Sequence, residues 1–180
     1  MPKRTLSIIA LLLLQVPTQS QQPQDITHVV AAIEEGKFHG WPANNGAWQW
    51  GDEFLVGFTQ GDFGDRDGHN ILGIQQSMFT RSTDGGNTWR MFDPDNFLDD
   101  DNIKWLPKRK KRISQPMRFR HKDFAMRIFA SGYNGNDYPM GCFYYSYDRG
   151  RTWTGPFFLV DLNSHPQLKG KILTPRTVYL

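Results

Sequence analysis

One eight-residue pattern occurs twice in the chain and guides the interpretation of the rest of the sequence. The two copies read Ser82-Thr83-Asp84-Gly85-Gly86-Asn87-Thr88-Trp89 and Ser146-Tyr147-Asp148-Arg149-Gly150-Arg151-Thr152-Trp153. They share serine, aspartate, glycine, threonine and tryptophan at the same five positions. Because five matched positions are not expected by chance in 180 residues, the sequence contains an internal repeat of one structural unit.

The shared residue types suit a tight turn between two β-strands. The aspartate can accept backbone N–H groups across the turn, and the glycine can adopt the positive φ that strains other residues. The β-branched threonine suits the start of the returning strand, where burial of the tryptophan ring contributes about 1.5–3 kcal/mol. We therefore predict a structural role for the ten shared residues Ser82, Asp84, Gly86, Thr88, Trp89, Ser146, Asp148, Gly150, Thr152 and Trp153.

The composition favours an all-β fold. Aromatic residues make up 14% of the chain, and 17 Gly and 11 Pro interrupt its apolar stretches, as in short strands joined by turns. No long amphipathic helical pattern occurs. Loops are predicted at 38–46 and 61–70, and a long charged connection at 93–112. Strands are predicted at 47–50, 53–59, 74–81, around Trp89, and at 114–120, 124–131, 141–147, 152–158 and 171–180.

The repeated pattern resembles the Asp-box, also called the BNR repeat, of the sialidase superfamily. In that superfamily the box lies between the third and fourth strands of a β-propeller blade, away from the catalytic face. The resemblance implies an all-β, six-bladed propeller, of which residues 38–180 would contain the first two blades and the start of a third. Residues 21–37 would lead into it, and we expect the chain to be the N-terminal part of a longer propeller.

The N-terminus has the pattern of a secretory signal peptide. Lys3 and Arg4 precede an apolar run over 6–14 that only Ser7 interrupts, and small residues suit cleavage after Ser20. The run is too short to span a bilayer well, so no stable membrane insertion is expected after cleavage. Residues 1–20 are therefore predicted to be removed, and the mature protein to be secreted or periplasmic.

The resemblance also indicates where substrate would bind. Sialidases carry an arginine in an R-I-P motif of the first blade, which binds a substrate carboxylate. The corresponding stretch here is Phe38-His39-Gly40-Trp41-Pro42, with Gly40 in the place of the arginine. His39 and Trp41 could instead contact a neutral sugar by hydrogen bonding and stacking; the alternative is a loop histidine and a core tryptophan.

A first-blade loop of sialidases carries the general acid, and residues 61–70 match it in location. Asp65 and Asp67 are the candidates, because glycoside cleavage needs an acid to protonate the leaving oxygen. With Asp62 they also form a loose D-x-x-D-x-D spacing, which could hold calcium but fits no EF-hand. An ordinary surface loop is the other interpretation. No metal and no cofactor is predicted.

Two arginines are candidates for binding an anionic group of the substrate. Arg118 shares a strand face with Arg120 by the period of two, and Arg176 begins a predicted inner strand. A guanidinium can hold a carboxylate with two parallel hydrogen bonds. Surface or inter-blade ion pairs are the alternative for each of them.

Charge and cysteine content limit the partners. The formal net charge is +3, and much of it comes from the basic run at 108–112. Such a run can bind nucleic acid or acidic polymers, but it also suits a solvated loop. No zinc-finger or RNA-binding motif is present, so a nucleic-acid partner is not expected. Cys142 is the only cysteine and is predicted to be a buried thiol.

These observations lead to a secreted, sialidase-like protein that acts on a glycan or glycoconjugate. The first hypothesis is an exo-acting glycoside hydrolase of the exo-α-sialidase type. A non-catalytic propeller that binds carbohydrate or protein is the alternative, and Gly40 favours it. A polysaccharide lyase or another hydrolase remains a third hypothesis, because a fold does not determine a function.

Overall fold

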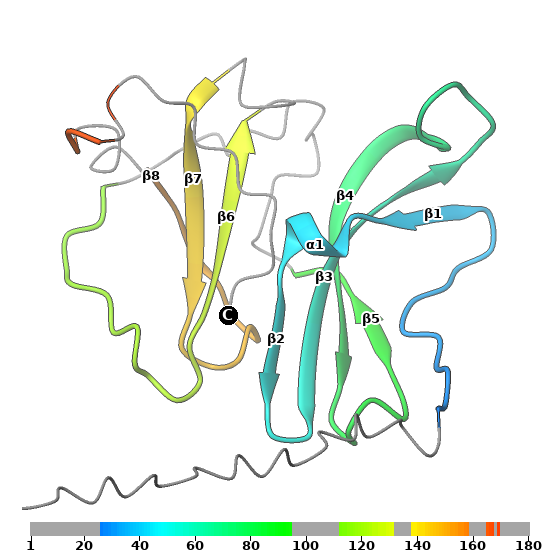
Figure 1. The fold of residues 1–180 in the computed structure, drawn as a ribbon, viewed down its shortest axis with the longest axis horizontal. Coiled ribbons are helices and arrows are strands. Elements are labelled where there is room, and N and C mark those ends of the chain that lie inside the picture. Colours follow the sequence, from blue (N-terminus) through cyan, green and yellow to red (C-terminus); the bar gives the residue numbers. More distant parts are fainter. Residues whose placement is uncertain (1–25, 95–111, 132–137, 159–164, 168, 170–180) are drawn as a thin grey trace, which may run out of the picture.

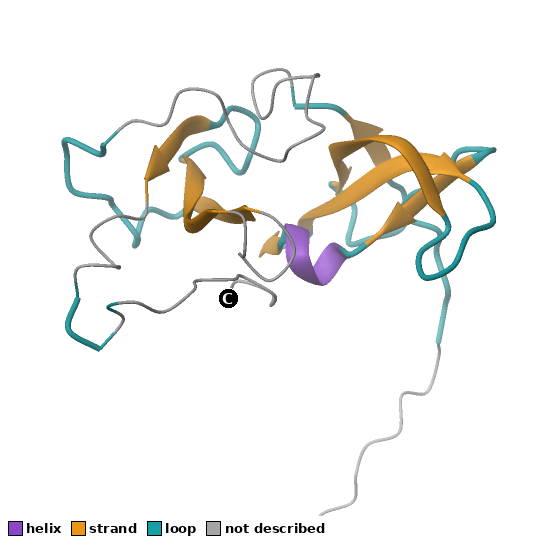
Figure 2. Cartoon of the chain, turned by 90° about the horizontal axis from the view of Figure 1, so that it is seen from above, coloured by secondary structure: helices purple, strands orange, loops and turns teal. Residues whose placement is uncertain are grey.

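The computed structural model describes residues 26–94, 112–131, 138–158, 165–167 and 169, most of them in two antiparallel β-sheets and their connections (Figures 1 and 2). Sheet A contains β1 (Lys37–Gly40), β2 (Ala47–Trp50), β3 (Glu53–Phe63), β4 (Ile71–Ser82) and β5 (Arg90–Phe92). Sheet B contains β6 (Ala125–Ser131), β7 (Tyr138–Ser146) and β8 (Thr154–Phe158). A short helix, α1 (Pro42–Asn45), separates β1 from β2. The all-β prediction is confirmed, although the two sheets do not close into a ring.

Several predictions lie outside the described residues. They are the signal peptide at 1–20, most of the basic run at 108–112, the strand at 171–180, and Arg176 within it.

Sheet A is built around the long hairpin of β3 and β4. The turn at Gly51 and Asp52 joins β2 to β3, which correspond to the strands predicted at 47–50 and 53–59. Strands β1 and β2 follow each other along the same edge of β3. Helix α1 crosses β3 at Gly57, whose N–H donates to Gly46 O at 2.8 Å. A Cβ at Gly57 would lie 2.6 Å from the carbonyl oxygen of Asn45, so only glycine permits this approach.

The structure corrects two of the predicted boundaries. The stretch 38–46, predicted as a loop, contains β1 and α1. The predicted loop at 61–70 is shorter, because β3 continues to Phe63 and β4 already begins at Ile71. In both cases the added strand residues pair with β3 or β4. The many glycine and aspartate residues in these stretches indicate turns and do not predict this pairing.

The predicted strand at 114–120 is wrong, because residues 112–124 contain no strand. Consecutive turns replace it: His121 N donates to Arg118 O, and Phe124 N donates to His121 O. Pro116 also lacks the N–H that a ladder would need. Among the residues that the structure describes, β6 therefore pairs only with β7.

The first copy of the repeat forms the turn between β4 and β5. The Oγ of Ser82 donates to the Asp84 carboxylate at 2.8 Å and accepts the N–H of Gly86 at 2.9 Å. The same carboxylate accepts the N–H and the hydroxyl of Thr88 at 2.9 and 2.6 Å. The hydrogen bonds of the serine and aspartate thus close the turn.

The second copy forms the same turn between β7 and β8. Ser146 Oγ donates to Asp148 at 2.7 Å and accepts from Gly150 N at 2.8 Å. Asp148 accepts the N–H and hydroxyl of Thr152 at 2.9 and 2.7 Å. The repeat therefore specifies one hydrogen-bonded corner in each sheet.

The second turn also packs directly against sheet A. Gly150 has φ 72°, and a Cβ there would lie 2.4 Å from Leu55 Cδ2. The Trp153 ring is 4% exposed and stacks on Phe79 with centroids 5.4 Å apart. Trp89 of the first turn is only half-buried, so the two tryptophans are not equivalent.

The core lies between the facing sides of the two sheets. Alternation along β3, β4, β6 and β7 turns one apolar face of each sheet toward the other. The buried cluster consists of Leu55, Phe79, Ala125, Phe129, Cys142, Tyr144 and Trp153. The thiol of Cys142 is buried in an aromatic environment, as predicted.

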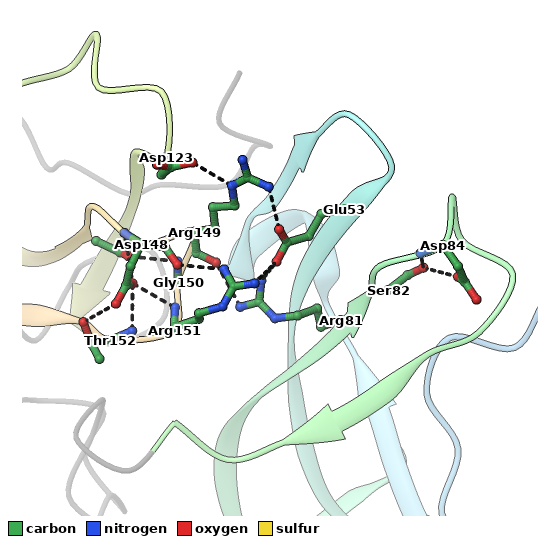
Figure 3. A network of polar contacts seen from close by, with 11 residues as sticks. Glu53, Arg81, Ser82, Asp84, Asp123, Asp148, Arg149, Gly150, Arg151 and Thr152 are labelled. Carbon is green, nitrogen blue, oxygen red and sulfur yellow. Dashed lines mark hydrogen bonds and ion pairs between the residues drawn. The ribbon is translucent and has the colours of Figure 1, made fainter.

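Glu53 of sheet A forms ion pairs with sheet B at the end of the two sheets where the repeated turns lie (Figure 3). Its carboxylate contacts Arg81 of its own sheet at 2.5 Å, and Arg149 and Arg151 of the second turn at 2.8 Å each. Arg149 also binds Asp123 at 2.7 Å. Burial opposes the charge on Glu53, but the hydrogen bonds from Arg149 and Arg81 outweigh it, so the pKa of Glu53 lies below its ordinary value.

Thr88→Val should raise the pKa of Asp84. The hydrogen bond from the Thr88 hydroxyl is the largest cause that lowers this pKa, from 3.8 to about 2. A carboxyl whose pKa is lower in the folded than in the unfolded chain stabilises the folded state at pH values above the unfolded pKa. This stabilisation is lost as the pH falls through the pKa of the folded state. An NMR pH titration of the Asp84 carboxyl should show the rise, whereas Thr83→Val should leave this pKa unchanged. An equal shift in both variants would contradict the assigned hydrogen bond.

Glu53→Gln should destabilise the protein by about 2 kcal/mol, because it leaves three guanidinium groups without their shared carboxylate in a partly buried place. Urea unfolding at neutral pH measures the loss. Asp52→Asn, on the exposed neighbouring position, is the matched control and should change stability by less than about 0.5 kcal/mol. Equal stability of the two variants would show that the ion pairs do not hold the sheets together.

Candidate functional site

The candidate site lies at the end of sheet A opposite the repeated turn. It consists of β1, α1 and the loop 64–70 between β3 and β4. Trp41 joins these parts, since its ring lies 5.1 Å from His69 of the loop in an edge-to-face arrangement. The same ring lies 5.1 Å from Phe38 of β1. The structure thus brings the predicted binding residue Trp41 together with the predicted acid-bearing loop.

The backbone of Trp41 is held in an unusual conformation. Its φ is 56°, in the left-handed region, which is rare for a bulky residue and recurs at functional positions. The side-chain nitrogen of the buried Asn45 donates to Trp41 O at 2.7 Å and to Thr59 Oγ1 at 3.3 Å. Asn45 therefore holds the backbone carbonyl of Trp41 in place.

Arg127 of β6 supports this conformation from sheet B. Its guanidinium donates to the side-chain oxygen of Asn45 and, at 2.9 Å, to Ser77 Oγ. The residue is 1% exposed, and its guanidinium lies 4.2 Å from the ring centroid of Phe129. A charge this deeply buried is rare unless it is paired or functional.

Arg127 is not among the arginines predicted from the sequence, Arg118 and Arg176. A signal was present, because the period of two places Arg127 on the same strand face as Ala125 and Phe129, both apolar. An arginine between inward-facing apolar residues is a candidate for a buried, structured cation.

His39 of β1 lies beside a hydrogen bond that joins Gln60 of β3 to Glu34, a residue that precedes β1. The Gln60 amide nitrogen donates to Glu34 at 2.7 Å and lies 3.3 Å from His39 Nε2. Because this amide nitrogen is a donor, Nε2 must accept, which requires a neutral imidazole. Burial lowers the pKa of His39 more than the nearby Glu34 charge raises it. His39 can therefore offer an uncharged hydrogen-bonding ring.

The predicted acids Asp65 and Asp67 are exposed on the loop 64–70. Arg66 donates to Ile71 O at 3.3 Å, and Gly64 N donates to Asn70 O at 3.3 Å, which shapes the loop. Asp62 instead pairs with Lys37 at 2.7 Å. In the described part of the chain, no three His, Cys, Asp or Glu side chains gather as a metal-binding group, so the calcium interpretation of this spacing has no structural support.

Arg118 does not join the candidate site. It lies beside sheet B, where its guanidinium is 4.6 Å from the ring centroid of Tyr147. The prediction that Arg118 lies on a strand was wrong, because residues 114–120 form no strand. Arg120 is exposed in a turn of the same segment.

The arrangement has the chemistry of a polar binding surface with an aromatic wall. Trp41 offers a half-buried ring, His39 and His69 offer imidazoles, and the loop offers two exposed carboxylates. Sugar hydroxyls can bond to such groups, while the apolar face of a pyranose can lie on the ring.

Glu34→Gln should lower the pKa of His39 further, because it removes the charge that raises it. The folded protein then binds the proton of the His39 imidazole even more weakly, relative to the unfolded chain, than it does with Glu34 in place. Stability should fall more steeply as pH drops below 6.5, the ordinary histidine value. NMR titration of the ring measures the pKa, and the exposed neighbour Glu35→Gln is the control that should leave it unchanged. A rise in the pKa of His39 in Glu34→Gln would contradict the assignment.

Comparison with protein-family models, curated proteins and solved structures gave no match for this chain. Among the described residues there is no helix of the length and apolarity needed to cross a lipid bilayer. The candidate function therefore depends on the residues and geometry of the chain itself.

Proposed function

We propose that the chain is part of a secreted, sialidase-like β-propeller protein that acts on glycans. The repeated turn supports the propeller, because it joins the last two strands of each sheet. In sheet A these are the third and fourth strands counted from β2, which is the position of the Asp-box in propeller blades. The lateral packing of the second turn against sheet A is consistent with neighbouring blades around an axis.

One observation carries the glycan site: Trp41 is held in a left-handed conformation with its ring against His69. The buried pair of Asn45 and Arg127 holds the backbone there, and Phe38 and His69 contact the ring, which supports a pre-organised ring. Pre-organisation favours recognition, because little side-chain freedom is lost on binding. Strand β1, helix α1 and the loop 64–70 would thereby form one binding surface.

The candidate reaction is glycoside hydrolysis, with Asp65 or Asp67 as the general acid. Either carboxyl would protonate the oxygen of the leaving sugar, while Trp41 and His39 hold the neighbouring ring. The alternative is binding without cleavage. The exposure of both carboxyl groups and glycine at position 40 favour that alternative, because an effective acid is usually shielded from water.

Trp41→Ala should weaken binding of the full chain to its glycan by about tenfold, the loss expected for one stacking ring. A panel of defined neutral and acidic glycans identifies the ligand, and calorimetry measures affinity. Trp89→Ala is the matched control, because Trp89 is also half-buried but lies in the turn at the other end of sheet A. Equal losses in both variants would reject the site.

Hydrolysis is tested on the same glycans with Asp65→Asn and Asp67→Asn. If one residue is the general acid, its variant should release sugar about 100-fold more slowly while binding persists. Binding without sugar release by the unmodified chain would favour the non-catalytic alternative. Absence of binding to every glycan would overturn the proposal as a whole.

A further inference from the structure

A second surface, independent of the Trp41 site, lies on sheet B. The segment 112–122 leads into β6 and contains no acidic residue. In Figure 1 this stretch is part of the yellow-green connection at the left of the molecule. Its exposed cations are Arg112, Arg118, Arg120 and Lys122. We call residues 112–122 the basic segment.

The basic segment has a defined backbone. Arg118 N donates to the hydroxyl of Tyr147 at 2.9 Å, and the Arg118 guanidinium covers the ring of the same residue. His121 N closes a turn onto Arg118 O. Phe119 remains 62% exposed while its ring packs against Phe124 at 5.5 Å. The positive charges are therefore presented from a fixed surface.

The carboxylates near the basic segment make their shortest contacts outside it. Asp123 binds Arg149 at 2.7 Å and lies 4.0 Å from Lys122. Asp148 accepts the donors of its own turn. In the described part of the structure no carboxylate pairs with Arg118 or Arg120, so their charges remain available to an anion.

The neighbouring aromatic rings help to determine which anion fits. Tyr145 stacks on Phe157 at 5.7 Å with an interplanar angle of 15°, and Arg118 covers Tyr147. The faces of Tyr145 and Tyr147 that make these contacts are closed to nucleobase stacking. The guanidinium groups can still form bidentate hydrogen bonds with sulfate or carboxylate groups.

We propose that the basic segment binds an anionic polysaccharide, whose sulfate or carboxylate groups pair with Arg118, Arg120 and Lys122. The exposed ring of Phe119 offers an apolar contact to a sugar. This surface is built from sheet B and the segment before it, whereas the Trp41 site belongs to sheet A, so the inference does not rest on the proposed glycan site. Duplex DNA is the competing polyanion.

The test measures binding of the full chain to dextran sulfate, with neutral dextran as reference. The double variant Arg120→Gln/Lys122→Gln should bind about tenfold more weakly and show a weaker dependence on salt. Both side chains are exposed and make no bond within the core, so the fold should be retained, which a thermal melt checks. Arg90→Gln/Lys169→Gln removes the same charge from exposed positions elsewhere and should leave affinity within about twofold.

Three results would overturn the proposal. They are no binding to dextran sulfate at physiological salt, an equal loss in the two double variants, or tighter binding to duplex DNA at matched charge. Trp41→Ala should leave dextran sulfate binding unchanged, so failure of this proposal and failure of the sheet A site are distinguished.

Discussion

The contact between the second turn and sheet A is the interaction on which the rest of the structure depends. Gly150 lies against Leu55 with no space for a Cβ, and Trp153 stacks on Phe79. The ion pairs of Glu53 with Arg149 and Arg151 surround this apolar contact. Apolar burial supplies the attraction, whereas the ion pairs fix the orientation, because a carboxylate shared among guanidinium groups tolerates little displacement.

The same interface also supports the candidate site at its other end. Arg127 of sheet B reaches Asn45, and Asn45 holds the carbonyl of Trp41. A change in how the sheets pack would therefore reach the Trp41 ring through two buried side chains. A buried, charged hydrogen bond makes this connection specific, because removing either partner would leave a desolvated polar group. Structure at the core and geometry at the candidate site are thus coupled.

The two polar surfaces follow from different kinds of local structure. The Trp41 surface combines a left-handed backbone position with an exposed acidic loop, and burial lowers the pKa of its His39. The charged side chains of the basic segment are all cationic, and Arg118 among them is anchored on Tyr147. These differences underlie the proposals of a neutral sugar for the first surface and a polyanion for the second.

The repeated serine, aspartate, glycine and threonine determined their turns from sequence alone, because each hydrogen bond joins residues at most four positions apart. The hairpin at Gly51 and Asp52 was likewise local. The absence of the predicted strand at 114–120 follows from local turns. The placement of β1 and the role of Arg127 depended on contacts across long sequence separations, such as Arg127 with Asn45. Tertiary structure decided these features, because strand pairing and burial of a charge depend on which distant residues satisfy their hydrogen bonds.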